Sequence, residues 1–326
     1  MVGSGGVGDV YQAVRASTGG MVAVKLVREH GDRQATERRV RRELDALLKL
    51  KGHPNVVQVE EVVRHPDGLA LVMEYVGGGS LVDLISTRGP LAPANAVAAV
   101  ADVARALADA HALGVVHRDI KPHNVMIGTF GQCKVCDFGI AAVLKDAAYT
   151  DRTSALSYRY ASPEEIEDHR DIGPPTDIYS LGVTVRQLLS GETNATRARA
   201  VIDERAGGLP ARPRDVLLRL ALLSDAMCAM DPTRRPTALQ VVGHVRALQQ
   251  LLGSDQVDSV AANSPTGDVA EDDDTTLVRP RPQAVSAGAA LAPAEAPRPP
   301  QSGVASSTSN PHGLPDPSSI AANWWE

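Results

Sequence analysis

The pattern of apolar and polar positions predicts strands in the first quarter of this 326-residue chain. Apolar and β-branched side chains cluster at 10–14, 21–26 and 69–73, which is typical of partly buried strands. Between 32 and 50, leucine and valine recur at helical spacing among many charges, so an amphipathic helix is predicted there. Residues 1–76 are therefore expected to form a small β-rich lobe with one helix.

A larger helical lobe is predicted after the glycine triplet at 77–79, which suits a flexible hinge. Apolar residues recur at helical spacing in four segments, 93–113, 178–189, 216–230 and 238–252. We therefore expect residues 77–252 to be mainly helical, and residues 1–252 to form one α+β domain of two lobes.

The composition changes at residue 253. Residues 253–326 hold ten of the 22 prolines, and Pro, Ala, Ser and Asp dominate them. Such a segment buries too little apolar surface to offset chain entropy, so it is predicted to be disordered. It also holds ten acidic residues against three arginines, within a formal net charge of -6. A near-neutral body with an acidic tail does not favour nucleic-acid binding.

The three cysteines are too few for a disulfide framework, which fits a reducing cytosol. Cys133 and Cys136 have a C-x-x-C spacing, but they lie in a predicted strand, where residues three apart point to opposite faces. Two half-buried thiols are therefore expected rather than a metal site. Because the sequence shows neither a secretion signal nor an apolar run long enough to cross a bilayer, a cytoplasmic location is predicted.

The most informative segment is His-Arg-Asp-Ile-Lys-Pro-His-Asn at 117–124, followed by Asp-Phe-Gly at 137–139. Phosphoryl transfer from ATP needs a carboxylate that orients the attacking hydroxyl, a cation on the moving phosphate and two oxygen ligands for magnesium. The residues that would supply these parts, in that order, are Asp119, Lys121, Asn124 and Asp137. A single Asp or Asn is usually a turn or cap residue, but that explanation would require four coincidences at fixed spacing.

A glycine-rich segment at 3–8 matches G-x-G-x-x-G-x-V. Glycines in a tight hairpin let backbone amides approach phosphates closely. A dinucleotide-binding fold would require a helix after this segment, whereas here a strand follows and carries Lys25. This order favours a kinase loop, in which the lysine grips the α- and β-phosphates. The residues predicted for this part of a nucleotide site are Gly3, Ser4, Gly5, Gly6, Val7, Gly8, Val10, Ala23 and Lys25.

From residue 3 to about residue 250, these motifs resemble the eukaryotic-type protein kinases, most closely the bacterial serine/threonine kinases. The resemblance implies ATP and Mg²⁺ (or Mn²⁺) between two lobes, and protein substrates. It also implies that Glu43, on the helix of the first lobe, pairs with Lys25. Residues 73–76 are similar to the hinge segment, where the backbone at Glu74 and Val76 would bind adenine and Met73 would lie at the back.

Positions outside the nucleotide site also match the family. Asp177 corresponds to the acid that holds the catalytic-loop backbone, and Glu164 and Arg235 correspond to a buried ion pair that braces the second lobe. Ser157 falls where the family has a hydroxyl that contacts the catalytic Asp and Lys, a feature associated with Ser/Thr specificity. His117 is expected to be a packed, hydrogen-bonded support rather than a base.

Several hydroxyls are candidate phosphorylation sites. Arg118 would face the segment that follows Asp-Phe-Gly, where a phosphate would satisfy its charge. Thr150 and Thr153 are therefore predicted autophosphorylation sites, with a transient homodimer as the reacting species. In the tail, Thr275 and Thr276 follow an acidic run, which resembles phosphothreonine segments that dock to forkhead-associated domains. The alternative is a solvated acidic linker.

The chain departs from the family at two places. Only two residues precede the glycine loop, where the family has most of a strand, so we expect the true start to lie upstream. The usual Pro-Phe near 191–194 is missing, which leaves substrate choice open. One alternative function is a catalytically weak pseudokinase scaffold, which the intact catalytic residues oppose. Another is a small-molecule kinase such as an antibiotic phosphotransferase, which Arg118 and the phosphorylatable loop oppose.

Overall fold

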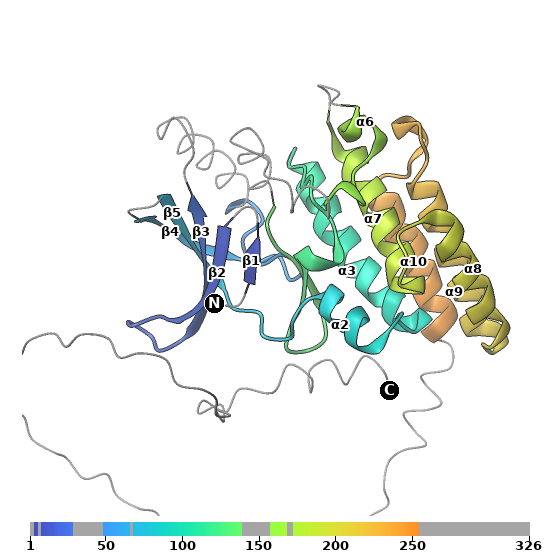
Figure 1. The fold of residues 1–326 in the computed structure, drawn as a ribbon, viewed down its shortest axis with the longest axis horizontal. Helices are drawn as coiled ribbons and strands as arrows, with labels where there is room; N and C mark the ends of the chain where they lie inside the picture. The colour runs from blue at the N-terminus through green and yellow to red at the C-terminus, as the bar shows by residue number, and fades with distance from the viewer. Residues whose placement is uncertain are drawn as a thin grey trace, which may run out of the picture. The chain divides into compact units, whose positions relative to one another are not determined.

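The first lobe is a five-stranded antiparallel sheet in the order β1-β2-β3-β5-β4 (Figure 1). The computed structural model describes residues 3–5, 8–28, 48–65, 68–138, 157–167 and 172–253. The strands of this sheet are β1 Gly3–Gly5, β2 Gly8–Val14, β3 Met21–Arg28, β4 Val59–His65 and β5 Gly68–Glu74. The strands predicted at 10–14, 21–26 and 69–73 are thus confirmed, each slightly longer than its pattern indicated.

Strand register positions the lysine of this lobe. Lys25 on β3 lies opposite Val10 on β2 and Leu71 on β5. Leu71 is fully buried, and Met73 on the same strand is nearly so. Lys25 therefore lies on a central strand between two paired neighbours, where the ladder of backbone hydrogen bonds holds its Cα in place.

The glycine segment forms a backbone-paired hairpin. Gly3 pairs with Val10 and Gly5 with Gly8, so β1 is the short first arm and β2 the longer second arm. The turn residues Gly6 and Val7 lie outside the described residues. Most of the helix predicted at 32–50 is also outside them, since the description resumes at residue 48.

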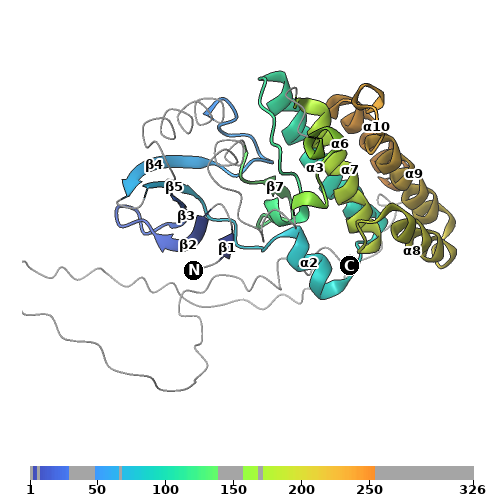
Figure 2. The ribbon, with the colours of Figure 1, turned by 45° about the horizontal axis from the view of Figure 1, so that its top comes forward.

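The second lobe consists mainly of helices, as predicted, with a small two-stranded sheet (Figures 1 and 2). The helices are α2 Leu81–Arg88, α3 Pro93–Ala112, α6 Pro163–Ile166, α7 Pro174–Ser190, α8 Ala195–Gly207, α9 Ala211–Met227 and α10 Ala238–Gly253. The short elements are the 3₁₀ turns η1 Pro122–Asn124 and η2 Pro232–Arg234 and the antiparallel strands β6 Val125–Ile127 and β7 Cys133–Val135. Helix α3 contacts α7, α9 and α10.

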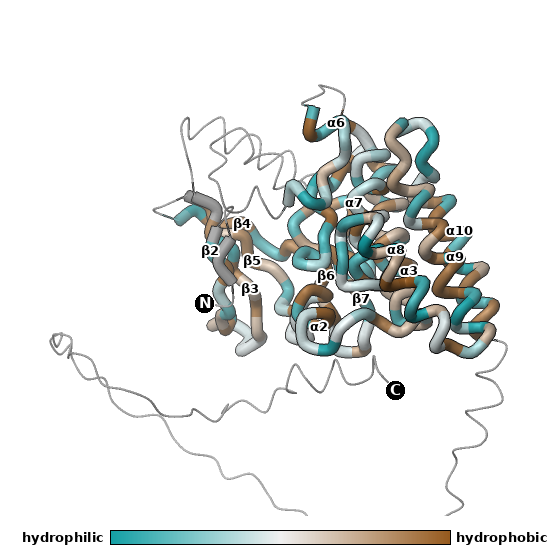
Figure 3. The backbone as a smooth tube through the Cα atoms, turned by 45° about the vertical axis from the view of Figure 1, so that its right-hand side comes forward, coloured by the Kyte–Doolittle hydropathy of each residue, from teal (hydrophilic) through white to brown (hydrophobic). Residues whose placement is uncertain are grey.

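The core of this lobe forms around the small residues of α3. Its buried face is largely alanine and valine, which lets the neighbouring helices approach closely. Leu107, Leu188 and Leu217 are almost fully buried on α3, α7 and α9, and each contributes about 1.5–3 kcal/mol of hydrophobic free energy. Figure 3 shows the resulting alternation of apolar and polar positions along α9 and α10.

The glycine triplet joins the two lobes by a close backbone contact. The amide of Gly78 donates to the carbonyl of Ile127 on β6, and the amide of Ile127 donates to the carbonyl of Gly79. A Cβ at position 78 would collide with the carbonyl oxygen of Ile127. Glycine is required there because two backbones approach each other, which is a more specific reason than hinge flexibility.

Candidate active site

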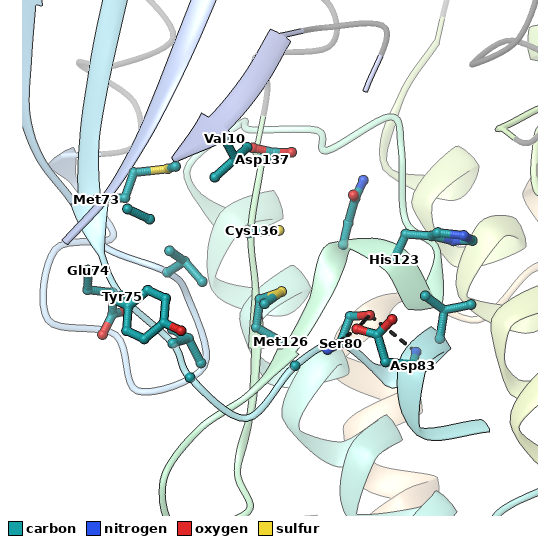
Figure 4. Close-up of a pocket in the computed structure, with 17 residues that line it drawn as sticks. Val10, Met73, Glu74, Tyr75, Ser80, Asp83, His123, Met126, Cys136 and Asp137 are labelled. Atoms are coloured by element: carbon teal, nitrogen blue, oxygen red, sulfur yellow. Dashed lines mark hydrogen bonds between the residues drawn. The ribbon is translucent and has the colours of Figure 1, made fainter. Parts of the chain in front are cut away.

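A cavity of about 430 Å³ lies between the sheet of the first lobe and the start of the second. This volume is in the range of small-molecule sites. Figure 4 shows Met73, Glu74 and Tyr75 along one side, Ser80, Asp83 and His123 along the other, and Met126 and Cys136 between them. Apolar side chains line the part near β2, β3 and β5, and polar groups gather toward the loops of the second lobe.

Lys25 and Asp137 form an ion pair beside this cavity. Their Nζ and Oδ2 atoms are 2.8 Å apart, and the lysine side chain is only 5% exposed. Burial alone would raise the pKa of Asp137, but the neighbouring Lys25 ammonium outweighs burial and lowers that pKa. A charged carboxylate is therefore maintained in the lining of the cavity, next to a desolvated cation.

The loop that precedes β6 brings three predicted residues together. Lys121 Nζ donates to both carboxylate oxygens of Asp119, at 3.0 and 2.8 Å, and to the hydroxyl of Ser157 at 2.8 Å. Asn124 Nδ2 donates to the Asp119 carboxylate at 2.9 Å and to its backbone carbonyl. The amide oxygen of Asn124 is thereby turned away from Asp119. The predicted contact between Ser157 and Lys121 is confirmed.

Asp177 holds the backbone of this loop, as predicted. Its fully buried carboxylate accepts from the amides of His117 and Arg118 at 2.8 and 2.7 Å. The Nε2 atom of His111 lies 2.8 Å from the same carboxylate, a third contact that sequence reasoning missed. Arg118 has φ of 65°, so these hydrogen bonds offset a backbone conformation that costs a non-glycine residue about 1–3 kcal/mol.

A second strained residue lies just after β7. Asp137 also has φ of 65°. The fully buried His117 bonds to the backbone on both sides of the site. Its Nδ1 accepts from the backbone amide of Asp119, so its Nε2 carries the proton and donates to the carbonyl of Cys136, the residue before Asp137, at 2.8 Å. Its ring meets the edge of Phe138 at a centroid distance of 4.6 Å. His117 is therefore a packed support, as predicted. It fixes the backbone at Asp119 and at Cys136, next to Asp137.

The two cysteines of the C-x-x-C spacing have different environments. Cys133 on β7 is fully buried, so the expectation of two half-buried thiols is wrong for it. Cys136 lies just beyond β7 and lines the cavity. Burial raises the pKa of both thiols, so both are protonated at neutral pH and poor metal ligands.

The structure brings seven of the predicted nucleotide and metal residues together around the cavity. Those that line it are Val10, Ala23, Met73, Glu74, Val76, Asn124 and Asp137. Sequence reasoning missed ten lining residues, which are Val57, Tyr75, Gly77, Gly79, Ser80, Val82, Asp83, His123, Met126 and Cys136. Backbone-lined cavities leave little side-chain signal, although the position of Cys136 next to Asp137 could have identified it.

Several predicted residues are not tested by this geometry. Gly3, Ser4, Gly5 and Gly8 are described by their backbone alone. The residues outside the described part of the chain are Gly6, Val7, Glu43, Thr150, Thr153, Thr275 and Thr276. Across the part that is described, no helix is long and apolar enough to span a membrane.

The donor set fits a nucleotide with a divalent cation. The described residues contain no group of three or more carboxylate, histidine or cysteine side chains that could hold a metal alone. Mg²⁺ commonly takes one or two protein oxygens and completes its shell with phosphate and water. The Asp137 carboxylate and the amide oxygen of Asn124 would provide those protein oxygens at the polar end of the cavity.

The fold and site together define a two-lobed kinase-type domain. A model of the protein kinase domain family matches residues 1–245, and the chain belongs to this family. The predicted class, a serine/threonine protein kinase domain, is confirmed, and this family uses ATP with a divalent cation to modify proteins.

The chain is similar to two bacterial serine/threonine-protein kinases. It is 38% identical over 193 residues to the serine/threonine-protein kinase PrkC of Bacillus subtilis, covering 59% of this chain and 30% of that protein. It is 37% identical over 200 residues to the serine/threonine-protein kinase PknL of Mycobacterium tuberculosis, covering 60% of this chain and 49% of that protein. The chain thus matches less than half the length of either relative.

A solved structure shares the fold. The chain matches a crystal structure of Rad53 1-466 in complex with AMP-PNP with a TM-score of 0.58 and 24% sequence identity, covering 76% of this chain and 63% of that one. The likeness confirms the predicted two-lobed kinase fold.

Proposed function

We propose that this chain transfers the γ-phosphoryl group of Mg-ATP to serine or threonine hydroxyls of proteins, its own included. The observation that carries the proposal is a connected set of charged and polar residues at a nucleotide-sized cavity. Asn124 and Asp137 line the cavity, Lys25 pairs with Asp137, and Asn124 contacts Asp119, which pairs with Lys121. Positioning and electrostatic stabilisation account for most of the catalysis of phosphoryl transfer. This set supplies both.

Each residue has a proposed role in the reaction. The substrate hydroxyl oxygen bonds to the γ-phosphorus, the bond to the bridging oxygen breaks, and ADP leaves with that electron pair. Asp119 orients the hydroxyl and receives its proton, while Lys121 offsets charge on the moving group. Asn124 and Asp137 would hold Mg²⁺, which neutralises phosphate charge when bound. Lys25 would exchange its contact with Asp137 for the α- and β-phosphates, with Glu43 as its proposed partner.

The remaining nucleotide contacts follow from the lining of the cavity. The backbone at Glu74 and Val76 is proposed to bind adenine, with Met73 closing the back of the cavity. Val10 and Ala23 would cover the base from the sheet side, and the backbone amides of residues 3–8 would approach the phosphates. The apolar side chains of Val10, Ala23 and Met73 at the base end suit a flat aromatic ring.

A labelling assay tests this function. Purified protein incubated with Mg²⁺ and γ-labelled ATP should label itself, with Thr150 or Thr153 among the sites found by mass spectrometry. Lys25→Met should lower the initial rate about 10²-fold or more, because it removes a buried cation from the phosphates. Lys51→Met, which changes an exposed lysine in a turn, should leave the rate unchanged. No label in the wild type would favour the pseudokinase scaffold.

The tail carries a separate part of the proposal. We propose that phosphorylated Thr275, with Val278 three places on, docks to a forkhead-associated domain, and that trans-phosphorylation proceeds through a transient homodimer. Charge-assisted hydrogen bonds to a phosphate would supply the affinity. Thr275→Ala with Thr276→Ala should abolish capture of such a domain by the phosphorylated protein. Ser259→Ala, elsewhere in the tail, is the matched control, and undiminished capture by the double variant would contradict the idea.

A further inference from the structure

An ion pair connects the two lobes, and one of its members, Glu74, lines the cavity. Lys134 on β7 lies with its Nζ 2.7 and 2.9 Å from the two carboxylate oxygens of Glu74 at the end of β5. The two side chains are only 14% and 26% exposed, so water screens this pair weakly. The pair joins residues 60 positions apart in the chain.

Gln58 completes this connection from a third segment. The backbone amide of Gln58 donates to the Glu74 carboxylate at 2.9 Å, and the backbone carbonyl of Gln58 accepts from the backbone amide of Glu74 at 2.9 Å. The Gln58 side chain is itself held, because Oε1 accepts from the Gly52 amide and Nε2 donates to the Val56 carbonyl. We name Gln58, Glu74 and Lys134 the hinge tie.

The segment that carries Gln58 is also bonded to the second lobe. The amide of Val57 donates to the carbonyl of Val135, and the amide of Val135 donates to the carbonyl of Asn55, both at 2.9 Å. Residues 55–58 thus lie between β7 and the end of β5 and bond to both. Glu74 receives bonds from Gln58 and Lys134, and it begins the segment that crosses from the first lobe to the second.

The hinge tie is connected along the chain to both ends of the cavity. Glu74 directly precedes Tyr75 and Val76, which line the base end, and Figure 4 shows Glu74 beside Tyr75. Lys134 lies three residues before Asp137, which lies at the phosphate end. A bidentate contact with a half-buried carboxylate therefore fixes the base-facing backbone relative to the strand that leads to Asp137.

We propose that Lys134 is a positioning residue for the nucleotide, acting through Glu74, so that the hinge tie sets ATP affinity rather than the rate of the chemical step. This inference rests on the proposed nucleotide site. Without Lys134, the Glu74 carboxylate keeps, among the described residues, only the backbone amide of Gln58 as a donor. The backbone at 74–76 can then adopt more orientations before the base binds. Ordering that backbone then costs binding free energy in the ground state and the transition state alike.

The test measures binding and turnover separately. For Lys134→Met and Glu74→Gln, the Kd of a non-hydrolysable ATP analogue, measured by calorimetry, and the KM for ATP, measured with casein as acceptor, should both rise about five- to tenfold, with kcat within about twofold of wild type. Glu74→Gln retains an acceptor for the Gln58 amide, so it removes the charge with little structural loss. The double variant should be no weaker than either single one, because one contact is lost in all three.

Controls separate positioning from stability. Lys134→Arg should restore Kd to within about twofold of wild type, since its guanidinium can also make a bidentate contact. Lys51→Met should change nothing. An unchanged Kd in Lys134→Met, or a joint fall of kcat, affinity and Tm without rescue by arginine, would overturn the inference. If the wild type itself bound no analogue and labelled no acceptor, the proposed function would fail instead.

Discussion

Asp119→Asn is expected to lower kcat for phosphoryl transfer by about 10²–10⁴-fold, the range for loss of a positioned general base. The substitution keeps the size of the side chain and removes its negative charge. Lys121 Nζ, which contacts both oxygens of Asp119, would then face an amide instead of a carboxylate. The hydroxyl would lose both its proton acceptor and its orientation.

The nucleotide should still bind to this variant. Asp119 is not among the residues that line the cavity, so the Kd of a non-hydrolysable ATP analogue should stay within about twofold of wild type. Initial rates with labelled ATP, with and without saturating acceptor, measure the loss of kcat. Asp109→Asn, an exposed aspartate on α3, is the matched control. Wild-type kcat in Asp119→Asn would remove Asp119 from the proposed mechanism.

Arg235→Ala is expected to destabilise the second lobe by about 3–5 kcal/mol, as when one partner of a buried ion pair is removed. The Arg235 side chain is fully buried, and it donates to both carboxylate oxygens of Glu164, at 2.6 and 2.8 Å. It also donates to the carbonyl of Pro175. The predicted ion pair is confirmed, and its loss would leave the Glu164 carboxylate buried with Thr176 as a remaining donor.

Thermal unfolding measures this loss. Tm should fall by about 10 °C, since 1 kcal/mol shifts Tm by about 2–4 °C in a domain of this size. Arg219→Ala breaks an exposed pair with Asp215 and should lower stability by less than about 1 kcal/mol. Equal effects of the two variants would show that the Glu164 pair does not brace the fold.

The same pair predicts a dependence of stability on pH. Burial acts to raise the pKa of Glu164, but the hydrogen bonds from Arg235 dominate and lower it to about 2, against an ordinary value of 4.5. A lowered pKa means that the contribution, about 3 kcal/mol, is present above pH 4.5 and is lost as the pH falls toward 2. Urea unfolding at pH 6 and pH 3 should therefore show a smaller gap between wild type and Arg235→Ala at the lower pH, by about 2 kcal/mol. A constant gap would contradict this assignment.

Local patterns predicted the elements whose burial follows a simple period. The strands that hold Lys25 and Met73 and the helices α3, α7, α9 and α10 all have a clear apolar face. The pattern did not reveal β4, because most of its side chains are exposed and its pairing with β5 defines it. Helix α8 was missed because it is rich in arginine and has only a weak apolar stripe. Helix α2 was missed because it is only eight residues long, although Leu81, Leu84 and Ile85 lie on one buried face.

The residues proposed to be catalytic could be predicted from the sequence, because the proposed chemistry requires particular side chains at short spacings. Asp119, Lys121 and Asn124 lie within six positions of one another, and they contact one another in the fold. Asp177, Glu164 and Arg235 were assigned from a family resemblance, and the structure confirms their contacts. Periodicity alone would not have connected them.

The amino-acid sequence by itself determined the family, the two-lobed class and the residues that can carry the reaction, since these depend on residue type, local spacing and hydrophobic period. Only the tertiary structure decided which distant groups meet. It paired Glu74 with Lys134 and His111 with Asp177, and it placed Cys136 in the cavity. The physical reason is that an ion pair or a cavity wall depends on distances between segments far apart in the chain. These distances are set by how the segments pack in the fold, and the residue pattern of one segment alone does not predict them.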